Sequence, residues 1–165
     1  MKNRVIRYVF WALTLAIMIF IFCHSAETAE ESSKTSMSFT QTVITVVYPE
    51  FSELPEAEKT TILESLQHLV RKGAHFSVYL LLGVTSFSAF CSYDLKRYIK
   101  ALAAFLLCAL YAASDEFHQL FVAGRSGQIS DILLDSAGSL CGIVITVGII
   151  FIYRNLRKGR RKNEQ

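Results

Sequence analysis

The chain alternates between long apolar runs and short charged segments. Four runs are rich in aliphatic and aromatic residues: 5–22, 74–91, 99–118 and 132–153. A helix needs roughly 20 apolar residues to cross a hydrocarbon core of about 30 Å. The pattern therefore predicts an all-α fold, a polytopic bundle of four transmembrane helices that forms a single membrane domain over residues 1–165.

The only long connection lies between the first two runs. Its polar stretch 27–38 has the small and charged composition of a mobile loop, and the apolar patch 39–47 is too short to span a bilayer. From Pro55 onward, apolar residues recur on one helical face. We therefore expect a short amphipathic helix in this first extracytoplasmic loop, leading into the second span.

Positive charge indicates the orientation. Lys and Arg cluster before the first run, between the second and third, and after the fourth, whereas the 26–68 connection holds eight Glu against two Lys. Short cytoplasmic loops retain Lys and Arg, so both termini are predicted to be cytoplasmic. The basic tail is interpreted as contacting anionic membrane lipid rather than nucleic acid.

A cleaved secretory signal is the alternative interpretation of the first run. The run is longer than a usual signal core, and residues 22–26 contain no small-x-small cleavage site, so an uncleaved anchor is favoured. The four cysteines lie in or at the ends of runs, and the topology places Cys23 and Cys91 at opposite faces. A disulfide framework is therefore not expected.

Polar residues gather where three of the predicted spans reach one membrane face. Helical spacing sets them in three stripes: Arg71, Lys72, His75 and Tyr79; Asp115, Glu116, His118 and Gln119; and Asp131 and Asp135, preceded by Arg125. A charge within the bilayer costs at least about 2.5 kcal/mol, so such residues face the bundle interior and pair. The stripes are therefore expected to converge.

Two interpretations of this convergence are open. In one, the stripes form an ionic network that only fixes helix packing, with Gly138 and Gly142 in a close helix contact. In the other, they form a polar cavity that opens to the outer leaflet. Its ligand-binding candidates are Arg71, Lys72, Tyr79, Gln119, Arg125, Asp131 and Asp135.

Acid–base chemistry is a further possibility within the cavity interpretation, which leaves open whether the protein is an enzyme. The catalytic candidates are His75, Asp115, Glu116 and His118, with the arginines holding an anion. The Asp115-x-x-His118 spacing is typical of metal-binding helix bundles. There is one such pair, no Cys cluster and two nearby arginines, so no metal and no cofactor are predicted.

The segments Arg71–His75 with Tyr79, Ser114–Gln119, and Gly124-Arg125 with Asp131, Asp135 and Gly138 resemble VanZ-like proteins. The resemblance covers roughly residues 71–142. Two features depart from the family pattern: the first span ends in Cys23-His24-Ser25 in place of the usual Ser/Gln, and Asn is also common at the position of Asp135.

The resemblance implies a multi-pass protein of the bacterial cytoplasmic membrane. The namesake of the family is associated with tolerance of teicoplanin, a glycopeptide with a fatty acyl chain that binds cell-wall precursors at the outer leaflet. We therefore expect an outer-face site that engages a lipid-linked or lipidated ligand, such as a precursor or lipoglycopeptide. The alternatives are an enzyme that modifies an envelope lipid and a structural or assembly subunit, with oligomerisation possible in each case.

Overall fold

A computed structural model describes residues 2–163 of the chain. Every regular element within these residues is helical. The elements are α1 (Lys2–Ser25), α2 (Ala29–Val47), the 3-10 turn η1 (Pro49–Glu53), α3 (Glu56–Phe90), α4 (Arg97–Gln119) and α5 (Ile129–Asn163). Helices α1, α3, α4 and α5 are long and apolar enough to cross a membrane. The predicted all-α bundle with four spans is confirmed.

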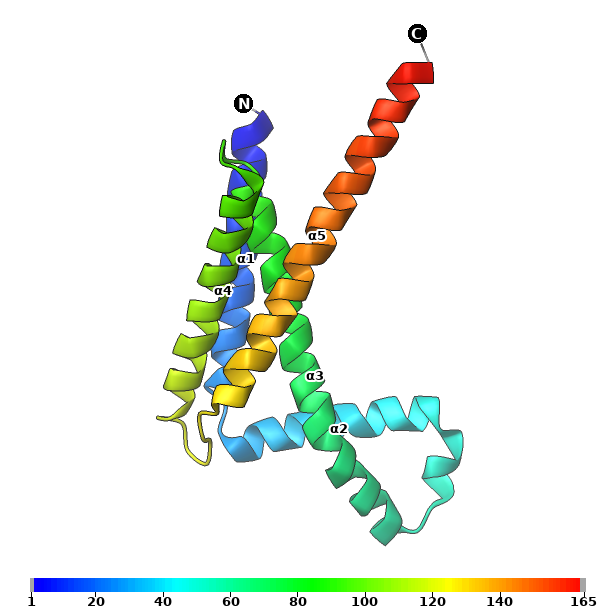
Figure 1. Cartoon of the computed structure of the whole chain (residues 1–165). Coiled ribbons are helices and arrows are strands. Elements are labelled where there is room, and N and C mark those ends of the chain that lie inside the picture. The colour runs from blue at the N-terminus through cyan, green and yellow to red at the C-terminus, as the bar shows by residue number, and fades with distance from the viewer. Residues whose placement is uncertain (1, 164–165) are drawn as a thin grey trace.

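The four long helices run up and down, so that the start of α1 and the end of α5 lie at the same end of the bundle (Figure 1). The α4–α5 turn and α2 lie at the opposite end. Helix α3 has 35 residues, which is about 50 Å of helix and exceeds the thickness of a hydrocarbon core. Its first turns therefore extend beyond the span, toward α2.

Helices α3 and α5 pack closely because glycines stand at their contact. A Cβ atom built at Gly138 would collide with the backbone oxygen of Phe76, and one built at Gly142 would collide with that of Leu80. On the α3 side, Gly83 meets the backbone of Ser139 in the same way. The contact expected for Gly138 and Gly142 is thus present, and it fixes α5 against the polar face of α3.

The prediction of a mobile loop over residues 27–38 was wrong, because residues 29–38 belong to α2. Thr28 caps the helix: its hydroxyl accepts a hydrogen bond of 3.3 Å from the backbone N–H of Glu31, whose carboxylate accepts one of 3.0 Å from the N–H of Thr28. This reciprocal pair satisfies two backbone donors that otherwise lack partners. Polar composition here reflects an exposed helix rather than missing structure.

Helix α2 crosses the lower part of α3 rather than running beside it (Figure 1). The side chain of Gln67 on α3 donates a hydrogen bond of 2.8 Å to the backbone oxygen of Ser33. The amphipathic helix expected from Pro55 onward forms the first part of α3 and continues without a break into the second span. Together α2 and this segment build a ledge at one end of the bundle.

Candidate functional site

A polar cavity of about 120 Å³ lies at the bundle end remote from the termini. Its walls come from α3, the end of α4, the α4–α5 turn and the start of α5. Eight of the eleven residues predicted for a site line it: Arg71, Lys72, His75, Glu116, Gln119, Arg125, Asp131 and Asp135. The three stripes thus converge as their spacing predicted.

One pair of residues joins the start of α5 to α3 at the edge of this cavity. Lys72 Nζ lies 3.0 Å from Asp131 Oδ1, and both side chains are about 30% exposed. Partly exposed pairs of this kind contribute little to stability. The pair nevertheless neutralises Lys72, which leaves Arg71 and Arg125 as the cations available to an anionic ligand.

The α4–α5 turn brings Arg125 back toward α1. Gly124 has a φ of 74°, which favours glycine and turns the chain. Arg125 Nη2 then donates a hydrogen bond of 3.2 Å to the backbone oxygen of His24. Burial and the neighbouring charge of Arg71 lower the pKa of Arg125 from its usual value, so the two guanidinium groups repel each other and an anion between them would be stabilised.

Glu116 has a structural contact in the same turn. Its carboxylate accepts a hydrogen bond of 2.9 Å from the backbone N–H of Gln128, just before α5 begins. An acidic group at the start of a helix is also favoured by the helix dipole. Glu116 therefore holds the α4–α5 turn in place, a role distinct from the acid–base role considered from the sequence.

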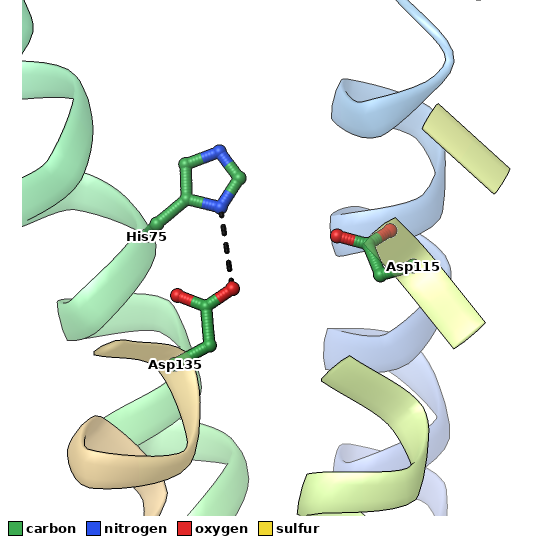
Figure 2. A group of neighbouring side chains, drawn as sticks. All are labelled: His75, Asp115 and Asp135. Atoms are coloured by element: carbon green, nitrogen blue, oxygen red, sulfur yellow. Dashed lines mark ion pairs between the residues drawn. The ribbon is translucent and has the colours of Figure 1, made fainter. Parts of the chain in front are cut away.

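The innermost part of the site is a buried cluster of three side chains from three helices, His75 on α3, Asp115 on α4 and Asp135 on α5 (Figure 2). His75 Nδ1 lies 3.7 Å from Asp135 Oδ2. Ligand-type atoms of all three residues lie within 4.8 Å of one another. Asp135 is fully buried and Asp115 is 3% exposed, so these charged groups lie away from bulk solvent.

Ser25, the last residue of α1, completes the surroundings of Asp115. Ser25 Oγ donates a hydrogen bond of 2.9 Å to Asp115 Oδ2, and Gln119 Nε2 donates one of 3.4 Å to the same oxygen. Ser25 was not among the predicted site residues. The available signal was a polar residue at the end of the first span, and recognising its role required the packing of α1 against α4.

Three predicted residues do not line the polar cavity: Asp115, which belongs to the buried cluster, Tyr79 and His118. Tyr79 is fully buried one turn beyond His75, and its hydroxyl has no hydrogen-bond partner among residues 2–163. The ring of His118 stacks on Phe22 with ring centroids 4.8 Å apart. His118 therefore packs against an aromatic ring of α1 and does not line the polar cavity.

An apolar groove of about 350 Å³ adjoins the polar cavity. Phe20 and Ile21 of α1, Phe39 of α2, and Val70 and Val78 of α3 supply its apolar walls. Arg71, His75 and Arg125 line both the groove and the polar cavity. A charged site and a hydrocarbon-lined groove therefore share one boundary.

Comparison with known proteins connects this architecture to a family. The sequence model of the family described as VanZ/LLP1 matches residues 10–152, which is most of the chain. The chain belongs to the VanZ/LLP1 family. This match confirms the resemblance noted from residues 71–142 and extends it over all four spans. Comparison with curated proteins gave no match, and comparison with solved structures gave none either.

The site of this VanZ/LLP1 membrane protein combines two chemical capacities. Arg71 and Arg125 present cationic groups to an anion, and guanidinium groups bind phosphate or carboxylate through two parallel hydrogen bonds. Deeper in the bundle, His75 between two buried carboxylates provides a group that can accept a proton or ligate a metal. The first capacity suits ligand binding and the second suits chemistry on what is bound.

Proposed function

We propose that this VanZ/LLP1 protein binds a lipid-linked or lipidated ligand of the cell envelope. The head group lies in the polar cavity, and the hydrocarbon chain lies in the adjoining apolar groove. The observation that carries the proposal is that Arg71, His75 and Arg125 line both spaces. A ligand that fills both must be anionic at one end and apolar at the other.

The head-group end of the ligand is a phosphate or a carboxylate. Burial and then the neighbouring charge of Arg71 lower the pKa of Arg125, and an anion bound between the two arginines removes the repulsion between their charges. Arginine suits the task because its planar group keeps its charge at all physiological pH values. Lys72 is occupied by Asp131, so the two arginines supply most of the recognition.

The hydrocarbon end accounts for the composition of the groove. Its walls include Phe20, Ile21, Val70 and Val78, contributed by two of the spanning helices, and Phe39 of α2. Each methylene removed from water contributes about 0.8 kcal/mol, although lipid tails already in the bilayer gain less. The groove therefore selects and orients a chain more than it supplies affinity.

The orientation of the protein supports a role at the outer leaflet. The distribution of Lys and Arg favours cytoplasmic termini, which puts the polar cavity at the non-cytoplasmic face. Acylated glycopeptides such as teicoplanin and the lipid-linked cell-wall precursors meet at this face. A contribution to teicoplanin tolerance follows if the site captures either molecule.

The proposal is tested by native mass spectrometry of the purified protein in detergent. The probe is dioleoyl phosphatidic acid, compared with dioleoyl phosphatidylcholine and with a phosphatidic acid bearing four-carbon chains. We expect preference for the first lipid, reduced retention in Arg125→Gln, and reduced retention in Ala74→Phe, which fills the groove. Arg97→Gln, an exposed arginine at the other bundle end, is the matched control.

Equal retention of all three lipids, or equal loss in Arg97→Gln, would refute a site that recognises both ends of the ligand. Cells expressing the same variants then give the functional measurement. Teicoplanin susceptibility is compared at equal amounts of folded protein in the membrane. Protection by the wild type and by Arg97→Gln, but not by Arg125→Gln, is the outcome expected for capture at this site.

A second candidate function is an enzyme that modifies an envelope lipid. The specific observation that favours it is the His75–Asp135 pair, in which a buried carboxylate lies 3.7 Å from an imidazole that lines the same cavity as Arg71 and Arg125. Formation of a new lipid product by the purified protein, lost in His75→Gln, distinguishes catalysis from binding. Stable binding with no product in mixed envelope lipids favours the binding function.

A further inference from the structure

We propose that His75, Asp115 and Asp135 bind a divalent transition-metal cation at the inner end of the polar cavity. One ligand atom from each side chain lies within 4.8 Å of the other two. Figure 2 shows the three side chains extending from three separate helices into the same space. The metal site is independent of the lipid proposal, since metal binding is measured with no lipid ligand added.

The charge of the cluster favours a bound cation. Asp135 is fully buried and Asp115 nearly so. Both oxygens of Asp135 and Oδ1 of Asp115 have no hydrogen-bond partner in the part of the chain that the structure describes. Burying an uncompensated carboxylate costs several kcal/mol. His75 supplies at most one positive charge for two carboxylates, whereas a divalent cation balances both and uses the unpaired oxygens.

The spacing between His75 and Asp135 also favours a bound cation. The distance of 3.7 Å between His75 Nδ1 and Asp135 Oδ2 exceeds the range of about 2.7–3.2 Å for a hydrogen bond. Two atoms that ligate one metal at about 2.0–2.2 Å lie roughly 3–3.5 Å apart when they are neighbours. The distance between His75 and Asp135 is therefore slightly longer than that of two neighbouring ligands, and the three atoms, which lie within 4.8 Å of one another, must move closer together to complete a coordination shell.

A second layer of contacts orients one of the proposed ligands, Asp115. Asp115 Oδ2 accepts hydrogen bonds from Ser25 Oγ at 2.9 Å and from Gln119 Nε2 at 3.4 Å. These contacts hold the carboxylate through Oδ2, whereas Oδ1 has no hydrogen-bond partner among the described residues and is free to ligate a cation. Metal-ligating carboxylates are usually held in this way by neighbouring donors.

The ligand set also indicates which cations fit. One imidazole nitrogen with two carboxylates suits manganese, iron or zinc, whereas magnesium and calcium prefer oxygen ligands alone. His75 and Asp135 line the polar cavity, so the cation reaches the site from the cavity and keeps open positions on that side. Arg125 is held by the backbone of His24, and its charge is directed toward α1.

No metal was predicted from the sequence because it offers one carboxylate–histidine pair on a single helix, Asp115 and His118, no Cys cluster, and two nearby arginines. In the structure His118 stacks on Phe22 instead. The residues that lie near Asp115 are His75 of α3 and Asp135 of α5. The proposed site therefore depends on tertiary packing. Its ligands are distant in sequence and follow no metal-binding spacing.

The test uses the full-length protein in detergent, with any affinity tag removed, and Mn²⁺ as the probe. Binding is measured by titration followed by electron paramagnetic resonance of Mn²⁺, which also reports a coordinated histidine nitrogen. We expect one Mn²⁺ per chain, and at least about tenfold weaker binding in His75→Gln, Asp115→Asn and Asp135→Asn. The nitrogen coupling should disappear in His75→Gln.

Glu64→Gln is the matched control, because Glu64 is an exposed carboxylate on α3 that lines neither the polar cavity nor the apolar groove. Its Mn²⁺ affinity should equal that of the wild type. Folded wild-type protein that binds no Mn²⁺, or an equal loss of affinity in Glu64→Gln, would overturn the proposal. If Asp135→Asn fails to fold, the variants at His75 and Asp115, on other helices, decide the question.

Discussion

Ser25 Oγ, at the end of α1, donates a hydrogen bond of 2.9 Å to the buried carboxylate of Asp115 on α4. The two residues are 90 positions apart in the sequence, and both are almost completely buried. The first span therefore closes the candidate site rather than acting only as an anchor. Its last residue, Ser25, donates a hydrogen bond to the carboxylate of Asp115, whose Oδ1 has no hydrogen-bond partner among the described residues.

Replacing this hydroxyl should destabilise the bundle. In Ser25→Ala, Asp115 Oδ2 keeps only the longer contact with Gln119, at 3.4 Å. Loss of a buried hydrogen bond to a charged group costs about 1.5–3 kcal/mol. Chemical unfolding of the purified protein, followed by tryptophan fluorescence of Trp11, measures the loss. Ser25→Thr keeps the hydroxyl and should retain most of the stability, and equal stability of all three proteins would contradict the prediction.

Helix contact through glycine gives a second prediction. In Gly142→Ala the added methyl group would collide with the backbone of Leu80, so α3 and α5 must separate. Overpacking of this kind typically costs about 1–3 kcal/mol. Thermal unfolding in detergent should show a clear decrease in melting temperature.

Gly148→Ala is the control for this substitution, because a methyl group there meets nothing within 4 Å among the described residues. It lies on the same helix and should leave the melting temperature unchanged or slightly raised, since alanine favours helix over glycine. A similar decrease in both variants would mean that helix propensity in α5, and not the contact with α3, determines the effect.

The sequence was sufficient to predict the four spans and most of the polar cavity. Both follow from the bilayer, which demands long apolar helices and turns charged residues inward. Arg71, His75 and Asp135 gather as expected because helical spacing fixes the face on which each one lies. The family match over residues 10–152 agrees with this description.

Other features required the tertiary structure. His118 was grouped with Asp115, yet three residues of helix rotate a side chain by about 300°, and the remaining 60° is enough to direct it to Phe22. Gln119 lies about 40° to the other side and stays in the cavity. By contrast, α2 had a local signal, the Thr28-x-x-Glu31 cap, that the polar composition obscured.

The cap of α2 predicts a dependence on pH. Hydrogen bonds from the backbone and side chain of Thr28 lower the pKa of Glu31 from its usual value. A lowered folded-state pKa means that the cap stabilises α2 fully above about pH 4.3, the usual pKa of glutamate. The contribution is lost as the pH falls through the lowered pKa.

Amide hydrogen exchange of residues 29–36 measures this effect. Exchange in the wild type, corrected for its intrinsic pH dependence, should show reduced protection of α2 in acid. Glu31→Gln cannot ionise, so its protection should vary less over the same range. If the two proteins lose protection in parallel, titration of another group controls the stability of α2.

The orientation of the bundle gives the last prediction, and it rests on two loops at opposite ends. Ser126 is exposed in the α4–α5 turn beside the polar cavity, and Asp94 is exposed in the α3–α4 loop at the end of the termini. We expect a membrane-impermeant maleimide to label Ser126→Cys in intact cells. Asp94→Cys should be labelled only after the membrane is permeabilised, since Lys and Arg near that loop favour the cytoplasm.

Both variants need a background without the four native cysteines, Cys23, Cys91, Cys108 and Cys141, all of which are free. Burial raises the pKa of the Cys91 thiol, which slows its reaction but does not remove it as a source of labelling. Labelling of Asp94→Cys and not Ser126→Cys in intact cells would place the polar cavity in the cytoplasm. A site there has no direct contact with an antibiotic or precursor at the outer leaflet, so the proposed ligand would have to be a lipid of the inner leaflet.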